Sequence, residues 1–161
     1  MKLILGLAVP VIFALMLNEI RSKYFAKITQ TLVYLPNFLS WVILGGIFST
    51  LLSPNGIVNH ALGALGMGNY YFMGDNKLFP GVLIATDVWK GFGYGSIVYL
   101  AALTGIDTGL YEAAAIDGAG KWKQTLHITL PGIAPTITIL FILETGNIMN
   151  VSFQKILLLM T

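Results

Sequence analysis

The sequence predicts an all-α integral membrane protein, and three observations support this fold class. Hydrophobic residues make up 56% of the 161 residues and charged residues only 10%, whereas soluble domains are about one quarter charged. The mean hydropathy is +0.79. Residues 28–74 and 124–143 contain no Lys, Arg, Asp or Glu, and each run reaches the roughly 20 apolar residues that cross a bilayer. We therefore expect residues 1–161 to form a single membrane domain.

Charged residues, prolines and glycines divide the chain into four predicted spans, at about residues 3–17, 37–53, 80–103 and 132–149. A further apolar stretch begins within residues 151–161, which makes four to five membrane helices in the prediction. The first segment also has the lysine and apolar run of a signal peptide, but it lacks a small-residue cleavage motif. Because this segment is short and the sequence stops in an apolar stretch, we expect a truncation at both ends.

The basic residues predict the side of the membrane on which each loop lies. They gather in two segments between spans: Arg21, Lys23, Lys27, Lys121 and Lys123. Because Lys and Arg favour cytoplasmic loops, residues 18–36 and 104–131 are predicted to be cytoplasmic and residues 54–79 external. The external segment contains the turn sequence SPNG, and a short interfacial helix is expected after it. His60 in that helix is interpreted as an exposed histidine rather than a metal ligand, because no second histidine is near.

The segment between the third and fourth spans, EAAAIDGAGKWKQTLHITLP, predicts two short helices separated by a turn. Residues 110–116 have high helix propensity. Asp107 or Thr108 is expected to cap this helix by accepting its first free backbone N–H bonds. Gly118 tolerates a positive φ angle and is expected to end the helix.

The second helix of this loop is predicted for residues 121–130, where Trp122, Leu126 and Leu130 recur at near-helical spacing. Pro131 is expected to terminate the helix and to begin the fourth span. The alanines leave one face thin enough for a partner to approach closely, while Trp122 is expected to act as a bulky anchor. Two interpretations stay open: a cytoplasmic docking site for a protein, or a helix pair lying in the lipid headgroups.

The spacing of residues in this loop resembles the EAA loop of permease subunits in binding-protein-dependent ABC importers. In that pattern a Glu-Ala-Ala block is followed by a glycine and then by a hydrophobic block that ends in proline. The matching positions here are Glu112, Ala113, Ala114, Asp117, Gly118, Ile128, Leu130 and Pro131. Thr125 departs from the family, in which many members carry phenylalanine. The flanking sequence resembles in particular the sugar-permease branch that handles oligosaccharides or polysaccharide fragments.

This resemblance implies a helical bundle like that of type I ABC importer permeases, in a bacterial-type cell membrane. It implies that residues 109–130 form coupling helices that insert into a cytoplasmic ABC ATPase and transmit nucleotide-driven motion to the spans. The other implied partners are a second permease subunit, identical or different, and an extracytoplasmic solute-binding protein. The implied activity is carbohydrate import. Import of peptides, amino acids or ions stays open, as does a membrane scaffold without transport.

Two charged residues near the middle of the third span, Asp87 and Lys90, are three residues apart and so share a helical face. Ionised groups at that depth are costly unless they are paired or face a wet cavity. Two interpretations follow. The two residues pair with each other, or they line a translocation path with Trp89, Tyr94 and Tyr99, since sugars are often held by aromatic faces and polar groups.

Other polar and small residues within the spans are less specific signals. Glu144 has apolar neighbours in the sequence. Two locations remain open for its side chain: the interior of the helix bundle, or a contact with another subunit. The glycines of residues 45–46 and of the sequence KGFGYGS are expected to permit close helix contacts or bending. The GFGYG sequence lies inside a span, without a preceding strand or a following Walker-type lysine, so it does not predict a nucleotide site.

The composition argues against several other function classes. The chain has no cysteine, which excludes disulfides and thiolate sites, and neither a metal site nor a cofactor is expected. The net charge of +2 is small and scattered, which argues against nucleic-acid binding. No Ser/His/Asp set, HExxH motif or phosphate loop is present, so an enzyme is not expected. Energy for transport therefore has to come from ATP hydrolysis on another chain.

Overall fold

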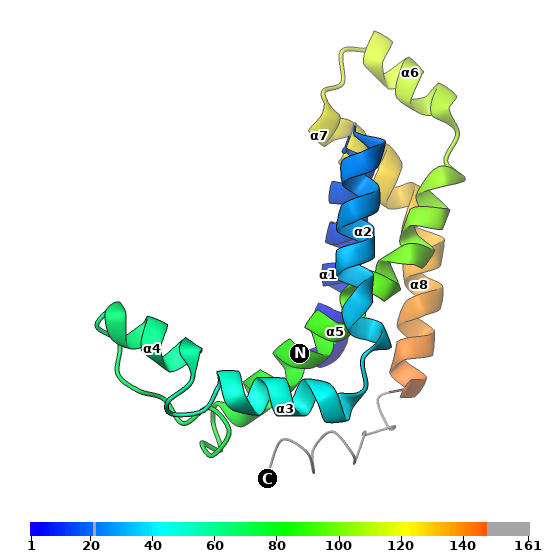
Figure 1. The fold of residues 1–161 in the computed structure, drawn as a ribbon. Coiled ribbons are helices and arrows are strands. Elements are labelled where there is room, and N and C mark those ends of the chain that lie inside the picture. The colour runs from blue at the N-terminus through cyan, green and yellow to red at the C-terminus, as the bar shows by residue number, and fades with distance from the viewer. Residues whose placement is uncertain (21, 148–161) are drawn as a thin grey trace.

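The computed structural model describes residues 1–20 and 22–147, and this part of the chain is built of helices without a strand (Figure 1). In chain order the elements are α1 (Lys2–Asn18), α2 (Lys23–Phe38), α3 (Trp41–Leu51), α4 (Ile57–Ala64), α5 (Phe79–Thr104), α6 (Thr108–Ile116), α7 (Lys121–Gln124), the π-helical turn η1 (Thr125–Thr129) and α8 (Leu130–Asn147). The all-α prediction is confirmed. Arg21, the last two residues of the fourth predicted span and the stretch 151–161 lie outside the described residues.

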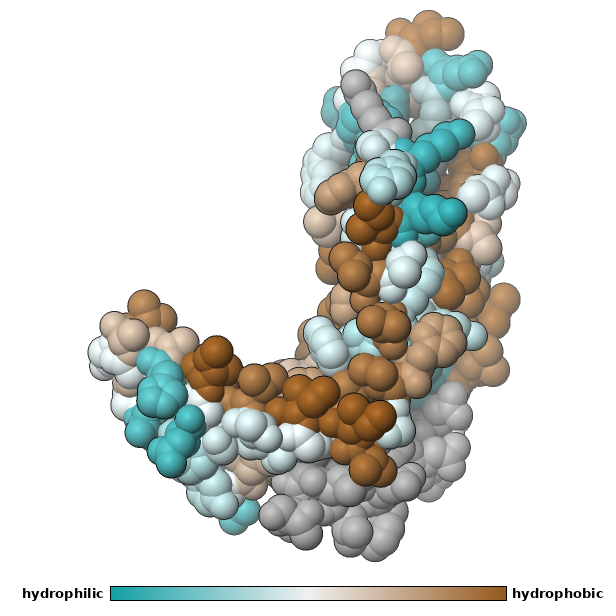
Figure 2. Space-filling view, viewed as in Figure 1, coloured by the Kyte–Doolittle hydropathy of each residue, from teal (hydrophilic) through white to brown (hydrophobic). Residues whose placement is uncertain are grey.

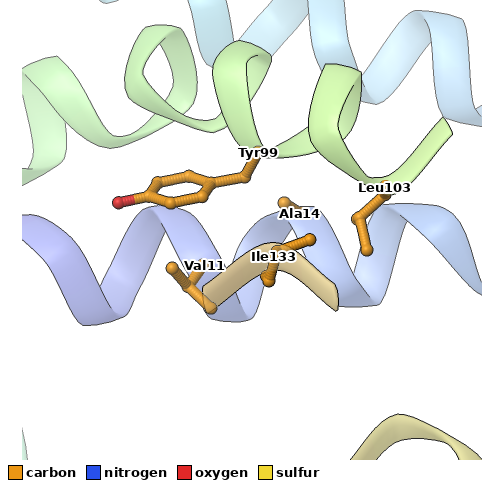
Figure 3. Packing of buried hydrophobic residues seen from close by; sticks show 5 residues of the cluster. All are labelled: Val11, Ala14, Tyr99, Leu103 and Ile133. Atoms are coloured by element: carbon orange, nitrogen blue, oxygen red, sulfur yellow. The ribbon is translucent and has the colours of Figure 1, made fainter. Parts of the chain in front are cut away.

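The core lies where α1, α5 and α8 meet. Its buried members come from all three helices (Figure 3): Val11, Ala14, Tyr99, Leu103 and Ile133. Small residues let these helices approach each other. Ala14 is fully buried, and a Cβ atom added at Gly95 would already touch the ring of Pro10 at 3.5 Å. Because lipid tails are as apolar as leucine, close packing of this kind is the main attraction between helices in a membrane.

Helix α2 occupies most of the segment that was predicted to be a loop, so the loop prediction for residues 18–36 is wrong. The helix runs beside α5 (Figure 1). A Cβ atom added at Gly93 of α5 would lie only 2.4 Å from the carbonyl oxygen of Val33, so the two backbones are in close contact there. The loop was predicted from its basic residues, but Lys23 and Lys27 occupy only the first turns of α2. The rest of this helix is uncharged.

The chain turns sharply between α2 and α3, whose axes are bent by 101°. Leu39 and Ser40 are extended at this corner, and the Ser40 hydroxyl starts α3 by accepting the backbone N–H of Ile43 at 3.3 Å. With 11 residues, α3 is about 16 Å long, whereas the hydrocarbon core of a bilayer measures about 30 Å. The predicted span over residues 37–53 is therefore not one continuous crossing helix.

Two of the other predicted spans correspond to long helices: residues 80–103 lie in α5, and the described part of 132–149 lies in α8. By length and composition, one helix in the described part of the chain can cross a membrane, Lys121–Gly146, or two if α2 and α3 together form one bent span. Helix α1 is apolar but has only 17 residues. These criteria therefore support one or two spans rather than the predicted four to five.

The helices α3 and α4 form an arm that extends away from the upright helices and gives the molecule an L-shaped outline (Figure 1). Asn59, buried on α4, fastens the loop that follows. Its Nδ2 atom donates to the carbonyl oxygens of Ser53 and Tyr70, and its Oδ1 atom accepts the N–H of Tyr70, each at 2.9 Å. The short helix predicted after SPNG is confirmed as α4, and His60 is exposed as predicted.

Large hydrophobic side chains are exposed along the arm and the adjoining part of the upright helices, as Figure 2 shows. Examples on α2 and α3 are Leu32, Leu35, Val42, Ile43 and Ile47. A contiguous apolar surface of this kind marks contact with lipid or with another protein. The hydrophilic residues gather instead at the upper end of the upright helices and on the outer tip of the arm (Figure 2).

Candidate docking loop and charged residues between the helices

Helix α6 lies beyond the end of the upright helices, joined to α5 and α7 by short connections (Figure 1). The carboxylate of Asp107 accepts the backbone N–H of Gly109 at 2.9 Å, so the cap of this helix is Asp107 rather than Thr108. Two large apolar side chains of α6 are exposed: Leu110 by 52% and Ile116 by 87%. The sequence reasoning missed both. Exposed apolar residues on a protruding helix are typical of a contact surface.

The end of α6 has the geometry predicted for Gly118, whose φ angle is +75°. Two hydrogen bonds close the helix: Gly118 N–H to the carbonyl of Ala115 at 3.1 Å, and Ala119 N–H to the carbonyl of Ala114 at 2.8 Å. This pair of bonds is the Schellman motif, which requires a left-handed residue where glycine carries no steric penalty. The turn therefore sets the direction in which the chain leaves α6.

Two side-chain contacts hold the loop together and tie it to the bundle. The hydroxyl of Tyr111 on α6 lies 3.0 Å from Oγ1 of Thr129, a buried residue in η1. The buried Gln124 donates from Nε2 to the carbonyl of Ala119 at 3.1 Å. The sequence analysis did not single out Tyr111 or Gln124 and gave the side chain of Thr129 no role, because these polar side chains become informative only once their burial is known.

The eight residues that match the EAA pattern separate into two groups. The first group is exposed or half-buried on α6 and its turn: Glu112, Ala113, Ala114, Asp117 and Gly118. The second group lies where η1 joins α8: Ile128, Leu130 and Pro131. The pattern therefore combines an outer surface on α6 with the base from which α8 begins.

The second helix of the loop does not stop at Pro131, contrary to the prediction. One helix continues from Lys121 to Gly146, with Pro131 as the second residue of α8. The π-helical turn explains this continuity, because the N–H of Leu130 bonds to the carbonyl of Thr125, five residues earlier. Proline lacks an N–H and its ring clashes with the carbonyl four residues before it, so a widened turn accommodates Pro131 without a break.

Trp122 does not anchor the loop on the described part of the chain, because its side chain is 80% exposed. It lines a groove of about 610 Å³ between α1 and the α7–η1 segment. On the same groove, Nζ of Lys121 lies 3.5 Å from Oε2 of Glu19. Both partners are more than half exposed, so this ion pair contributes little stability.

Asp87 pairs with Lys2 of α1, because Nζ of Lys2 lies 2.6 Å from Oδ2 of Asp87. The predicted pairing of Asp87 with Lys90 is therefore wrong. Lys2 is distant from Asp87 in sequence, and only the packing of α1 on α5 brings its ammonium group near this carboxylate. Sequence spacing alone favoured Lys90, which is three residues away. Lys2 and Asp87 line a cavity of about 330 Å³ together with Glu144 of α8, so Glu144 takes part in a charged group between helices.

Lys90 places its ammonium group 4.5 Å from the centroid of the Trp41 ring, at the corner where α2 turns into α3. Two neighbours of Lys90 on α5 make edge-to-face ring contacts with the same pair of helices. The pairs are Trp89 with Phe48 of α3, at 5.6 Å between centroids, and Tyr94 with Phe38 of α2, at 6.4 Å. Aromatic contacts with both α2 and α3 therefore lie near this cation of α5.

Tyr99 lies in the core rather than on this side of α5, and it is only 2% exposed. Its hydroxyl has no hydrogen-bond partner in the described part of the chain. The five candidate path residues therefore occupy three different surroundings. Asp87 faces the cavity shared with α1 and α8, Tyr99 is buried in the core, and the other three lie at the α2–α3 corner.

The fold and these sites define a class: a helical membrane subunit that presents a two-helix loop at one end and places charged residues between its helices. The chain belongs to the family of binding-protein-dependent transport system inner membrane components, whose family model matches residues 6–157. The family resemblance that the EAA loop predicted is confirmed, and with it the assignment to an inner-membrane component of a transport system.

Several curated proteins are similar to this chain. The polygalacturonan/rhamnogalacturonan transport system permease protein YteP of Bacillus subtilis is 40% identical over 94% of this chain and 48% of its own length. Protein LplB of Bacillus subtilis is 36% identical over 99% of this chain and 50% of its own length. The lactose transport system permease protein LacF of Rhizobium radiobacter is 34% identical over 86% of this chain. The chain thus spans about half the length of the curated relatives it matches.

Solved structures agree with this assignment. A bacterial ABC transporter involved in the import of the acidic polysaccharide alginate contains a chain that is 44% identical, with a TM-score of 0.91 over 97% of this chain and 55% of that chain. The alginate transporter in complex with an alginate pentasaccharide-bound periplasmic protein gives 43% identity and a TM-score of 0.93, over 99% of this chain and 56% of that chain. The fold of the described residues is therefore that of an importer permease.

Proposed function

We propose that this chain is part of a permease subunit that imports a carbohydrate, an oligosaccharide or polysaccharide fragment, using ATP hydrolysed on cytoplasmic partner subunits. The observation that carries the proposal is the protruding α6 helix with its Gly118 turn, in a chain of this family. The names of the relatives support the cargo class, since those proteins are described as transporting polygalacturonan, rhamnogalacturonan or lactose, or as importing alginate.

The α6–α7 loop, within residues 104–131, is the proposed docking site for the ATPase. The exposed surface of α6 includes Glu112 and the apolar side chains of Leu110 and Ile116, which suits insertion of this helix into a partner groove. The other end of the loop continues without a break into α8, because of the π-helical turn. A movement of the loop would therefore be transmitted to α8 as a lever, which is how we envisage coupling of nucleotide binding to the membrane helices.

The remaining partners are proposed on the same basis: a second permease subunit, identical or different, and an extracytoplasmic solute-binding protein. The exposed apolar arm offers surface for the second subunit or for lipid. Residues 54–79 are the proposed external segment, and residues 104–131 the proposed cytoplasmic one. In the proposed path, Trp89, Lys90 and Tyr94 contribute together at the α2–α3 corner. Asp87 and Tyr99 contribute from two other surroundings.

Copurification of the ATPase tests the coupling role, with two glycines as a matched pair. Gly118 needs its positive φ angle, whereas Gly120 has a φ angle of −67°, and a Cβ atom at either glycine would meet open space. In the natural transporter, Gly118→Val is expected to lose the copurifying ATPase, and Gly120→Ala to retain it. Retention of the ATPase by Gly118→Val, or loss of it by both variants, would contradict a docking role for this turn.

Uptake by cells that contain the natural transporter tests the cargo class. Labelled oligosaccharides are expected to enter in an ATP-dependent manner, and labelled peptides or amino acids are not. Entry of peptides or ions alone would replace the carbohydrate assignment by another import function. A chain with neither uptake nor a copurifying ATPase would have to be reassigned as a membrane scaffold.

A further inference from the structure

The geometry assigns a substrate-recognition role to Lys90: we propose that its ammonium group binds the carboxylate of an acidic sugar at the corner between α2 and α3. The inference rests on the proposed carbohydrate import and narrows the cargo to oligosaccharides that contain uronic acid. The site consists of Lys90 over the ring of Trp41, with Trp89 and Tyr94 on either side of it along α5.

Lys90 is a cation without a carboxylate partner among residues 1–20 and 22–147. In these residues the ion pairs join Lys2 to Asp87 and Lys121 to Glu19. Asp87, the acid nearest to Lys90 in sequence, is therefore paired across to α1. Lys90 is half-buried on α5, and a charge withdrawn from water is costly unless it is paired. A passing carboxylate supplies the anion that the described residues do not.

The contact with Trp41 holds the ammonium group in place without neutralising it. The distance of 4.5 Å to the ring centroid is within the range of a cation–π interaction. Such a contact uses one side of the ammonium group and leaves other N–H bonds for a ligand, because a lysine carries three donors. Trp41 therefore orients the charge, and the substrate carboxylate completes its coordination.

The neighbouring rings suit the apolar faces of sugar units. Trp89 is 45% exposed and Tyr94 is 52% exposed, so both rings keep open surface after their edge-to-face contacts with Phe48 and Phe38. From residue 89 to residue 94 the helix rises about 7.5 Å. Tyr94 lies one turn from Lys90 on the same face of α5, whereas Trp89 lies about 100° away around the helix axis. Tyr94 is therefore placed to hold a sugar face beside a carboxylate bound at Lys90, and Trp89 offers a second ring at the edge of the site.

A purely structural role for Lys90 makes a different prediction. If the contact with Trp41 only braces the α2–α3 corner, then its loss will slow the import of every cargo by the same factor. If Lys90 binds the carboxylate, then its loss will affect acidic cargo selectively. The ratio of uptake rates for two substrates that differ only in charge separates these roles.

The experiment uses the natural transporter with all its partner subunits and two labelled substrates, a trimer of galacturonic acid and its methyl ester. Variants are Lys90→Gln, which removes the charge, and Lys90→Arg, which keeps the charge and the cation–π contact. Lys77→Gln is the matched control, because it removes an exposed lysine from the segment before α5. Since the same partner proteins serve every variant, a change in the acid-to-ester ratio between variants reports the permease.

Wild type, Lys90→Arg and Lys77→Gln are expected to prefer the free acid, whereas Lys90→Gln should lower the acid-to-ester ratio by about tenfold or more, as for loss of a charged hydrogen bond. An unchanged ratio in Lys90→Gln, or equal losses for both substrates, overturns the role of Lys90 while leaving carbohydrate import intact. Uptake of neither substrate by wild type, together with uptake of a non-carbohydrate, overturns the proposed function itself.

Discussion

The ammonium group of Lys2 and the carboxylate of Asp87 form an ion pair of 2.6 Å that joins the first turn of α1 to α5. The pair lies on the cavity to which Glu144 of α8 also contributes. Three helices that meet in an apolar core therefore also meet around a group of charges. Lys2 is mostly exposed and Asp87 partly exposed, so the pair lies at the edge of this cavity rather than sealed between the helices.

Breaking this ion pair is expected to weaken the contact between α1 and α5 modestly. A double-mutant cycle with Lys2→Gln and Asp87→Asn should give a coupling energy of about 0.5 to 1 kcal/mol, the range for partly exposed pairs. Thermal unfolding of the purified transporter in detergent provides the measurement. A coupling energy near zero would mean that the two charges do not stabilise each other in solution.

The close contact of α2 with α5 makes Gly93 sensitive to any side chain. In Gly93→Ala the new Cβ atom would lie 2.4 Å from the carbonyl oxygen of Val33, and overpacking of this kind costs about 1 to 3 kcal/mol. Gly91 is the matched control, because a Cβ atom there meets nothing within 4 Å. Gly91→Ala should therefore keep or raise the melting temperature, while Gly93→Ala lowers it. Equal melting temperatures for the two variants would contradict the packing of α2 on α5.

The three hydrogen bonds of Asn59 predict that this residue controls the order of the loop after α4. Asn59→Ala should lower the local stability of residues 53–70 by about 2 to 3 kcal/mol, at about 1 kcal/mol for each hydrogen bond. The measurement is amide hydrogen exchange across this segment. His60→Ala, at the exposed neighbouring position, should leave exchange unchanged. Similar protection in wild type and Asn59→Ala would refute this role of the Asn59 side chain.

The cap of α6 by Asp107 predicts a graded response to substitution. Asp107→Ala removes the acceptor for Gly109 N–H and should destabilise α6 by about 1 kcal/mol, whereas Asp107→Asn retains a capping oxygen and should behave like wild type. Faster hydrogen exchange confined to residues 108–116 in the alanine variant checks this expectation. Faster exchange in both variants would point to the charge of Asp107 rather than to its capping bond.

Prediction from sequence succeeded where the signal is local. The helix α6 and the positive φ angle of Gly118 follow from the propensities of adjacent residues, which also limited the cap to Asp107 or Thr108. Pro131 was misjudged because its own chemistry indicates a helix break, while the compensating π-helical turn depends on the preceding five residues. The two apolar side chains Leu110 and Ile116 were overlooked because apolar residues are common in a membrane sequence. Such a residue indicates a contact surface only once its exposure is known.

Composition alone predicted the membrane class, and short-range pattern predicted the loop with its glycine turn. These properties depend on the transfer of side chains into lipid and on the backbone preferences of neighbouring residues, which a sequence contains directly. Only the tertiary structure decided that α2 is a helix packed on α5, that Lys2 is the partner of Asp87, and that Lys90 lies over Trp41. Each of these contacts joins residues far apart in the chain, so its energy exists only after the helices have packed.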